Sequence, residues 1–333
     1  MSEDQYRKGV SVVVCCYNSS ARLPETLNHL MNQTVPNHIE WEVVIVDNKS
    51  TDNTIELCNS TFKANKFYRY KIVSELNQGL SYARKKGLDT ALYDYIIYCD
   101  DDNWLDSNYI ANAYRLMSYN TNIGACGGIG QPVTDNDPPK YFKDFAIGFA
   151  VGEQGNEEGP TQRDTLYGAG LIVRKSILVS LYNNGFVTKL SDRKGNNITS
   201  CGDSELTLII KAVGYELWYS PTLTFKHYIP TNRQDWAYIK KLYSSFGEGI
   251  GKLLPYYVLI RDKDPKPWLF YFSSYIYKIF KSILRIKPLK QKEIDIIYNI
   301  NLIKSLLKDR NFFHDNILQL SSFKKNNLSK KLS

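Results

Sequence analysis

The stretch Tyr95-Ile96-Ile97-Tyr98-Cys99-Asp100-Asp101-Asp102-Asn103 decides the fold, because an apolar strand pattern in it runs directly into three adjacent carboxylates. Strand packing gives no reason for three neighbouring negative charges. Oxygen-rich ligand sets suit Mg²⁺, Mn²⁺ or Ca²⁺, and ligands of open α/β sheets bind at the carboxyl ends of the strands. The run therefore predicts a metal that holds a phosphorylated ligand. The alternative is a solvated acidic turn before a helix that begins near Asp106.

The pattern around this stretch predicts a mostly parallel sheet covered by helices. Apolar strand patterns at 10–16, 42–46, 68–73, 95–99 and 123–129 alternate with helical patterns. Repeated β-α units of this kind imply parallel strands joined by helical crossovers. Two further short strands are expected at 215–219 and 222–226. We therefore expect an α/β fold followed by a helical tail.

Charge is distributed unevenly along the 333 residues. The whole chain has a net charge of +8, and residues 261–333 hold 16 Lys/Arg against 6 Asp/Glu, a net of +10. Residues 1–260 are therefore close to neutral, at −2. The six cysteines form no CxxC pair, no signal peptide is evident in residues 1–8, and no uninterrupted apolar stretch could span a membrane. We expect a cytoplasmic protein with no nucleic-acid partner and leave its oligomeric state open.

Polar side chains stand at each expected strand end in the first half. Asn18, Asp47 and Asn77 follow the first three strands, and the triple Asp follows the fourth. On a parallel sheet these ends share one edge, so the side chains should meet in one crevice. Asn77-Gln78-Gly79 through Arg84 could bring backbone N–H groups and a guanidinium to a phosphate or ribose. The alternatives are local turns: Asp47 in its own turn, and Asn77–Arg84 at a helix start.

The second half offers two candidates with two interpretations each. Asp203 opens an amphipathic helix, so it is either a structural N-cap or a general base that takes a proton from a hydroxyl. His227 ends a strand and either completes a metal site or is a satisfied structural histidine. The long segment 130–165 is expected to bind or gate a ligand, or to be disordered.

The tail between Pro255 and Pro288 interleaves aromatic residues with Lys and Arg. This composition is typical of a helix that lies at a membrane surface, with rings at headgroup depth and cations towards anionic lipid. A helix packed on the main domain, or a contact between two copies, would explain it equally well.

Taken in order, four motifs resemble the nucleotide-sugar half of a family 2 glycosyltransferase with the A-type fold. They are residues 12–18, residues 46–54, Asn77-Gln78-Gly79 with Ala83-Arg84, and Cys99-Asp100-Asp101-Asp102. Further on, residues 168–170, 202–206 and 227–233 resemble the acceptor segment, the Glu-Asp-x-x-Leu motif and a His-x-x-Pro element of polysaccharide-synthesis members. The resemblance covers residues 9–250. It implies one Rossmann-like nucleotide-diphospho-sugar transferase domain, with a donor half at 9–130 and an acceptor half at 131–250, before a basic aromatic extension at 251–333.

The resemblance also implies roles for individual residues. Asp203 would be the catalytic base, and Asp100, Asp102 and His227 would hold Mn²⁺ or Mg²⁺. The donor, most simply a UDP-sugar, would be bound by Tyr17, Asn18, Asp47, Asn77, Gly79, Arg84, Asp100 and Asp101. The acceptor, a glycan or lipid-linked oligosaccharide, would be bound by Gly168, Ala169, Gly170 and Glu205. The chain departs from the family pattern at Gly202, where Glu is usual.

The implied reaction is metal-dependent transfer with inversion, in surface-polysaccharide synthesis at the inner face of a membrane. A sugar nucleotidyltransferase is one alternative, but the Tyr17-Asn18-Ser19-Ser20 turn lacks the glycine-rich phosphate loop that such an enzyme needs. The other alternative is an inactive, membrane-peripheral homologue that serves as a binding module.

Overall fold

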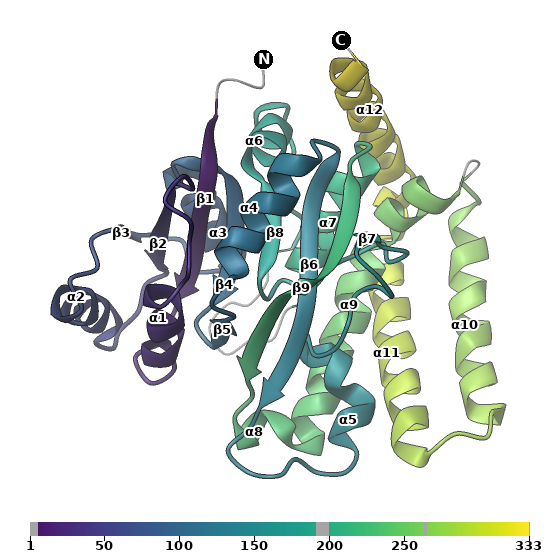
Figure 1. Ribbon diagram of the computed structural model, residues 1–333. Helices are drawn as coiled ribbons and strands as arrows, with labels where there is room; N and C mark the ends of the chain where they lie inside the picture. The colour runs from purple at the N-terminus through teal and green to yellow at the C-terminus, as the bar shows by residue number, and fades with distance from the viewer. Residues whose placement is uncertain (1–5, 191–199, 263–264, 333) are drawn as a thin grey trace.

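One sheet organises the first two thirds of the chain (Figure 1). The computed structural model describes residues 6–190, 200–262 and 265–332. Its strands are β1 (Arg7–Cys16), β2 (Trp41–Asp47), β3 (Tyr70–Ser74), β4 (Tyr93–Asp100), β5 (Asn103–Leu105), β6 (Ile123–Val133), β7 (Gly159–Pro160), β8 (Leu171–Arg174) and β9 (Glu216–Tyr228).

Helices cover this sheet and then continue beyond it. They are α1 (Leu23–Met31), α2 (Thr54–Ala64), α3 (Leu80–Thr90), α4 (Tyr109–Tyr119), α5 (Phe142–Phe145), the 3₁₀ turn η2 (Ala146–Phe149), α6 (Lys175–Asn183), α7 (Gly202–Ala212), α8 (Thr231–Gln234), α9 (Trp236–Arg261), α10 (Trp268–Leu284), α11 (Leu289–Lys308), the 3₁₀ turn η3 (Arg310–Phe312) and α12 (Phe313–Leu332).

The strand order is β3-β2-β1-β4-β8-β6-β9-β5, with β7 paired to β9. The first four strands are parallel, as predicted. β8 runs antiparallel to both β4 and β6, and β9 is parallel to β6. Six of the nine described strands therefore point the same way, and their carboxyl ends lie at one edge.

Burial explains why these segments are strands. β2 is buried along its whole length, and β1 is buried from Gly9 to Val14, so their β-branched runs face packed helices on both sides. One core cluster, which includes Val13, Ile96 and Leu208, lies on one face of the sheet. The other, which includes Val12, Ile97 and Tyr109, lies on the opposite face.

The second half differs from the sequence expectation in one element. The two short strands predicted at 215–219 and 222–226 are a single strand, β9, of 13 residues. Its pairing with β6 shifts register between Gly127 and Ile129, opposite the segment between Tyr219 and Thr224. An irregularity of this kind lets one strand pass through Pro221 without ending.

The last four helices form a layer beside the sheet. α9 packs against α7, α11 and α12, and α10 packs against α11 (Figure 1). Gly247 and Gly251 of α9 make this possible, because a Cβ at either position would collide with α11 at Tyr298 or Ser305. In the parts of the chain that the structure describes, no helix is long and apolar enough to cross a membrane.

Candidate active site

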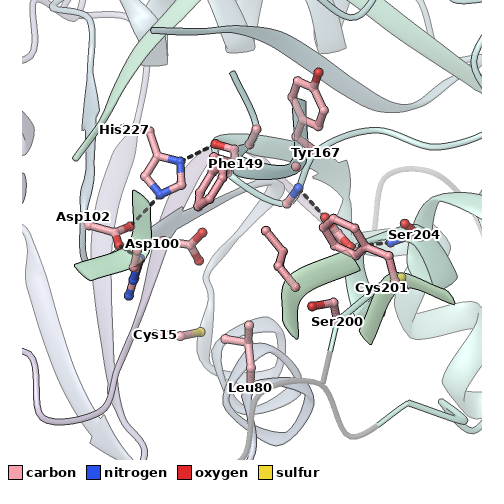
Figure 2. A pocket seen from close by; sticks show the side chains of 18 of the residues that line it. Cys15, Leu80, Asp100, Asp102, Phe149, Tyr167, Ser200, Cys201, Ser204 and His227 are labelled. Carbon is pink, nitrogen blue, oxygen red and sulfur yellow. Dashed lines mark hydrogen bonds and ion pairs between the residues drawn. The ribbon is translucent and has the colours of Figure 1, made fainter. Parts of the chain in front are cut away.

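A pocket of about 520 Å³ lies at the carboxyl ends of the parallel strands. Its walls come from the ends of β1 and β4, the start of α3, the loop before β8, the start of α7, and helices α9 and α11. Figure 2 shows Asp100, Asp102 and His227 on one side of this pocket and Cys201 and Ser204 on the other. Of the four polar positions expected to meet in one crevice, the triple Asp lines the pocket, whereas Asn18, Asp47 and Asn77 do not.

Asp101 has a structural role in the wall of the pocket. Its carboxylate accepts hydrogen bonds from the Ser19 hydroxyl and from Arg22 Nη2, the latter at 2.6 Å, and its carbonyl accepts the Thr26 hydroxyl at 2.9 Å. Burial and the neighbouring Asp102 raise the pKa of Asp101, and Arg22 opposes this rise. These contacts pin the end of β4 to the loop between β1 and α1.

Asp102 faces the other way, towards the end of β9. Only 3% of Asp102 is exposed. Its Oδ2 lies 2.9 Å from Arg233 Nη1, and its Oδ1 lies 3.4 Å from His227 Nε2. Successive side chains after a strand point to opposite sides. Asp101 therefore points to its structural partners, whereas Asp102 points to Arg233 and His227.

His227 is held in one orientation. Its Nδ1 lies 2.6 Å from the Phe149 carbonyl, which can only accept a hydrogen bond, so Nδ1 carries a proton. Nε2 then faces Asp102 either protonated or as a metal ligand. Burial works to lower the pKa of His227, but the Asp102 and Asp100 carboxylates bring about a net rise.

The described residues contain no ready-made cage of three His, Cys, Asp or Glu ligands for a metal ion. They nevertheless fit a metal shared with a diphosphate, because Mg²⁺-type sites commonly use one or two carboxylates and complete their shell with phosphate oxygens and water. Asp102, with Asp100 and His227 beside it, offers that partial shell. Its contact with Arg233 would have to give way.

The other predicted donor residues divide into two groups. Tyr17, Arg84, Asp100 and Asp101 line the pocket. Asn18, Asp47, Asn77 and Gly79 are not among its lining residues; their contacts belong to the loops around it.

Asn48, which the sequence did not single out, organises the donor loops. Its Nδ2 donates to the carbonyls of Glu75 and Asn77, and its Oδ1 accepts the Gly79 N–H at 2.7 Å. Asp47 accepts the Ser50 N–H at 3.2 Å, a hydrogen bond within its own turn. The sequence did contain a sign of this role, because an Asn follows Asp47 directly after the second strand, and Asn side chains often form hydrogen bonds to backbone groups in loops.

Asp203 is the second residue of α7, two positions after the N-cap position. Cys201 occupies the N-cap position, with φ of 82°. The Oδ1 of Asp203 accepts the Ser204 N–H at 2.8 Å and its Oδ2 accepts the Gly168 N–H at 2.7 Å. Each oxygen keeps a second lone pair, so a carboxylate fixed in this way still accepts a proton from the pocket.

Gly168 is required at this point. A Cβ there would lie 2.8 Å from Arg84 Nη2 and 3.0 Å from the Asp203 side chain. Gly168 and Ala169, two of the predicted acceptor residues, line the pocket. Gly170 does not: its φ of +67° and the Tyr109 hydroxyl on its carbonyl make it a structural turn residue, which corrects the prediction.

Glu205 also requires a correction. The predicted acceptor contact is fully buried, does not line the pocket, and accepts hydrogen bonds from the backbone of Lys189 and Leu190 and from the Tyr256 hydroxyl. Burial raises the pKa of Glu205, while these hydrogen bonds oppose the rise. Asp203 and Glu205 are two positions apart on a helix, so they point to different faces, and only Asp203 reaches the pocket.

Aromatic side chains form another part of the pocket lining. They come from η2, α9 and α11 and include Phe149, Tyr238, Tyr243, Phe246 and Tyr298. No short motif marks these residues, because they come from three distant segments. The prediction that 130–165 binds a ligand fits the placement of 147–150, Arg163 and Thr165 in the wall.

Comparison with known proteins adds a family match. The model for "Glycosyl transferase family 2" matches residues 11–179, about half of the chain. Cholesterol galactosyltransferase of Borreliella burgdorferi is 33% identical over 124 residues, which are 37% of this chain and 33% of that protein. Poly-beta-1,6-N-acetyl-D-glucosamine synthase of Staphylococcus epidermidis is 31% identical over 129 residues, 38% of this chain and 30% of that protein. The match thus spans about a third of these relatives.

Solved structures share the fold across nearly the whole chain. The mannosyltransferase PcManGT from Pyrobaculum calidifontis, in complex with GDP-Man and Mn²⁺, aligns with a TM-score of 0.58 and 18% identity over 92% of this chain and 88% of that one. S. aureus TarS 1–349 in complex with UDP-GlcNAc aligns with a TM-score of 0.51 and 14% identity over 90% and 92%. At these identities the likeness concerns the fold.

Proposed function

The chain belongs to glycosyl transferase family 2, and from that premise we propose that it moves a sugar from a nucleotide-sugar donor to a hydroxyl of a glycan or lipid-linked acceptor, with inversion. One observation carries the proposal. Asp100, Asp102, His227 and Asp203 all line a single pocket at the strand ends. Figure 2 shows the first three on the side away from Cys201 and Ser204, between which Asp203 stands in the sequence. A phosphate-binding end and a proton-accepting end therefore face one cavity.

The residues divide the reaction between them. Asp203 accepts the proton of the attacking hydroxyl while that oxygen forms a bond to the anomeric carbon, and the bond from this carbon to the nucleoside diphosphate breaks. Gly168 N–H and Ser204 N–H keep the carboxylate in place during the step. Arg84 and Arg233, which line the pocket, supply positive charge for the departing diphosphate.

Mn²⁺ or Mg²⁺ would be held by Asp102, with Asp100 and His227 beside it. When bound, it would offset the charge that develops on the leaving diphosphate. Two observations support this assignment: PcManGT, which shares the fold, is a complex with GDP-Man and Mn²⁺, and Phe149 orients His227 with Nε2 towards Asp102.

The acceptor end favours an acceptor with apolar or ring surfaces. Aromatic side chains from α9 and α11 pack against sugar faces and apolar chains alike. The relatives named for cholesterol and for a polysaccharide illustrate both acceptor classes. We favour a lipid-linked saccharide in surface-polysaccharide synthesis, used at the cytoplasmic face of a membrane.

Calorimetric titration with UDP, GDP and dTDP, each with and without Mn²⁺, tests the proposal. We expect one nucleotide, most simply UDP, to bind in a Mn²⁺-dependent manner. No binding of any nucleotide, with or without Mn²⁺, would overturn the proposal and favour the inactive binding module. Release of pyrophosphate from a nucleoside triphosphate and a sugar phosphate would instead favour a nucleotidyltransferase.

A further inference from the structure

The turn between α10 and α11 concentrates exposed apolar side chains. Among the described residues, 18 large hydrophobic side chains are exposed, and eight of them lie between Leu269 and Leu289. We use "the α10–α11 turn" for residues 280–289, which join the end of α10 to the start of α11. In this segment Phe280 is 62% exposed, Leu284 is 82% exposed and Leu289 is 84% exposed. Single exposed apolar residues are ordinary, but clustering on this scale marks an interaction site.

The fold does not need this apolar face. α10 is anchored near its start by Trp268 and Tyr271, which are buried in a cluster with α9, α11 and α12. At its far end only Ser282 is buried, and Lys287 pairs with Asp295 of α11 at 2.6 Å. Figure 1 shows α10 as the outermost helix, with α11 between it and the rest of the molecule.

The charge of the same segment indicates what covers it. Residues 268–290 contain five Lys or Arg and no Asp or Glu. A second copy docked on this face would bring two such cationic surfaces together. A surface that is both apolar and anionic satisfies the rings and the cations at once, and an anionic bilayer is such a surface.

The placement of the turn is consistent with docking. It lies at the end of the molecule towards which β6 and β9 run, the same end as α5 and α8 (Figure 1). Lys290, at the start of α11, sits over the rings of Trp236 at 4.0 Å and Tyr141 at 4.4 Å, so the turn is tied to the start of α9. α9 in turn lines the aromatic end of the pocket.

We propose that the α10–α11 turn docks the protein on an anionic lipid bilayer. Phe280, Ile283 and Leu284 enter the boundary between headgroups and acyl chains, and Lys281 and Arg285 contact lipid phosphates. The proposal of membrane docking rests only on the exposed apolar and cationic side chains of the α10–α11 turn. That docking brings a lipid-linked acceptor to Asp203 rests on the proposed function.

Sedimentation with vesicles of phosphatidylcholine plus phosphatidylglycerol, and of phosphatidylcholine alone, tests the docking. The full chain should bind the anionic vesicles, and salt should weaken the binding. The triple variant Phe280→Ser/Ile283→Ser/Leu284→Ser should lose at least about tenfold in partitioning, given the contribution of each buried methylene. Lys281→Gln/Arg285→Gln should lose about fivefold for each charge removed.

The matched control changes three exposed side chains elsewhere: Tyr68→Ser/Tyr119→Ser/Val187→Ser, at positions that are 78%, 87% and 75% exposed. It should bind vesicles like the unmodified chain. Equal loss in the control and the turn variant would overturn the proposal, as would no binding of the unmodified chain. A dimer in light scattering that the turn variant abolishes would assign the face to a second copy instead.

Nucleotide titration separates this proposal from the proposed function. The turn variant should bind nucleotide like the unmodified chain, because none of its three positions lines the pocket. Vesicle binding without nucleotide binding would leave the docking standing and remove the transferase. Nucleotide binding without vesicle binding would leave the proposed transferase function standing and overturn the docking.

Discussion

The two sides of the pocket are built in contrasting ways. On the proposed donor side, polar side chains follow β1, β2 and β4 and are fixed by hydrogen bonds. Ser19 and Arg22 fix Asp101, and the 75–79 loop fixes Asn48. On the proposed acceptor side, aromatic side chains of α9 and α11 line the pocket, and Asp203 is the carboxylate that lines it with them. Every nucleoside-diphosphate sugar carries the same diphosphate group, so a rigid polar frame suits it, whereas an apolar wall accommodates varied acceptors.

Asp203→Asn should have the largest effect, because it removes the proton acceptor from the acceptor side. We expect transfer to fall by about a hundredfold to ten-thousandfold, the usual contribution of a general base. Transfer is measured as sugar incorporated from the donor into a membrane extract. Nucleotide affinity should be unchanged, since the donor frame is intact.

The same variant also separates the two roles of Asp203. Its oxygens accept two backbone N–H groups, and an Asn side chain satisfies only one of them. The lost hydrogen bond lowers thermal stability under either role, so nucleotide affinity decides: if it falls together with transfer, Asp203 acts chiefly as a structural residue of α7.

Asp102→Asn and Asp101→Asn make a matched pair on the donor side. Asp102→Asn should lower Mn²⁺-dependent nucleotide affinity by about tenfold or more and leave metal-independent affinity unchanged. Asp101→Asn should instead destabilise the fold by about 1–3 kcal/mol, because it weakens hydrogen bonds to Arg22 and Ser19. Calorimetry and urea unfolding measure the two effects. Loss of metal dependence in Asp101→Asn alone would reverse the assignment.

The contrast between the two sides also explains what could be predicted from the sequence. β1, β2 and β4 were evident because each is a continuous apolar run, and the polar residues that follow them share an edge by topology. The aromatic wall could not be predicted, because Tyr243 and Tyr298 reach one pocket only through the packing of α9 against α11, and Phe149 comes from a third segment, η2.

Glu205 shows a second limit. The motif around Asp203 includes both acids, but a helix rotates neighbouring side chains to different faces, and the motif does not show which face meets the pocket. β9 shows a third: the dipeptide Ser220-Pro221 reads as a turn between two strands, whereas a register shift against β6 lets the strand continue.

Glu205→Gln should change stability and its dependence on pH. Gln cannot accept hydrogen bonds at both terminal atoms, so Leu190 N–H or the Lys189 and Tyr256 donors lose a partner, at about 1–3 kcal/mol. Nucleotide affinity should be unchanged because Glu205 does not line the pocket. Urea unfolding at a series of pH values measures the free energy of unfolding.

The sign of the pH effect follows from the raised pKa of Glu205, which burial causes. A raised pKa means that the folded state binds the proton more tightly than the unfolded state. The stabilisation from this group is complete below the unfolded-state pKa and is lost as pH rises through the folded-state pKa. The difference in stability between the unmodified chain and Glu205→Gln should therefore shrink with rising pH, and a difference that grows would contradict the buried environment.

The smallest expected effect is that of Asn18, which tests whether the donor frame or the donor itself uses this residue. Asn18 has φ of 49°, and its Oδ1 accepts the Thr51 N–H at 2.8 Å, so its visible role is to join two loops. Asn18→Gly should cost about 1 kcal/mol for the lost hydrogen bond, and Asn18→Ala about 1 kcal/mol more, because only glycine adopts this backbone region freely. Nucleotide affinity should change less than about threefold in Asn18→Gly, since one neutral hydrogen bond within the frame is at stake. A larger loss would restore the predicted direct contact with the donor.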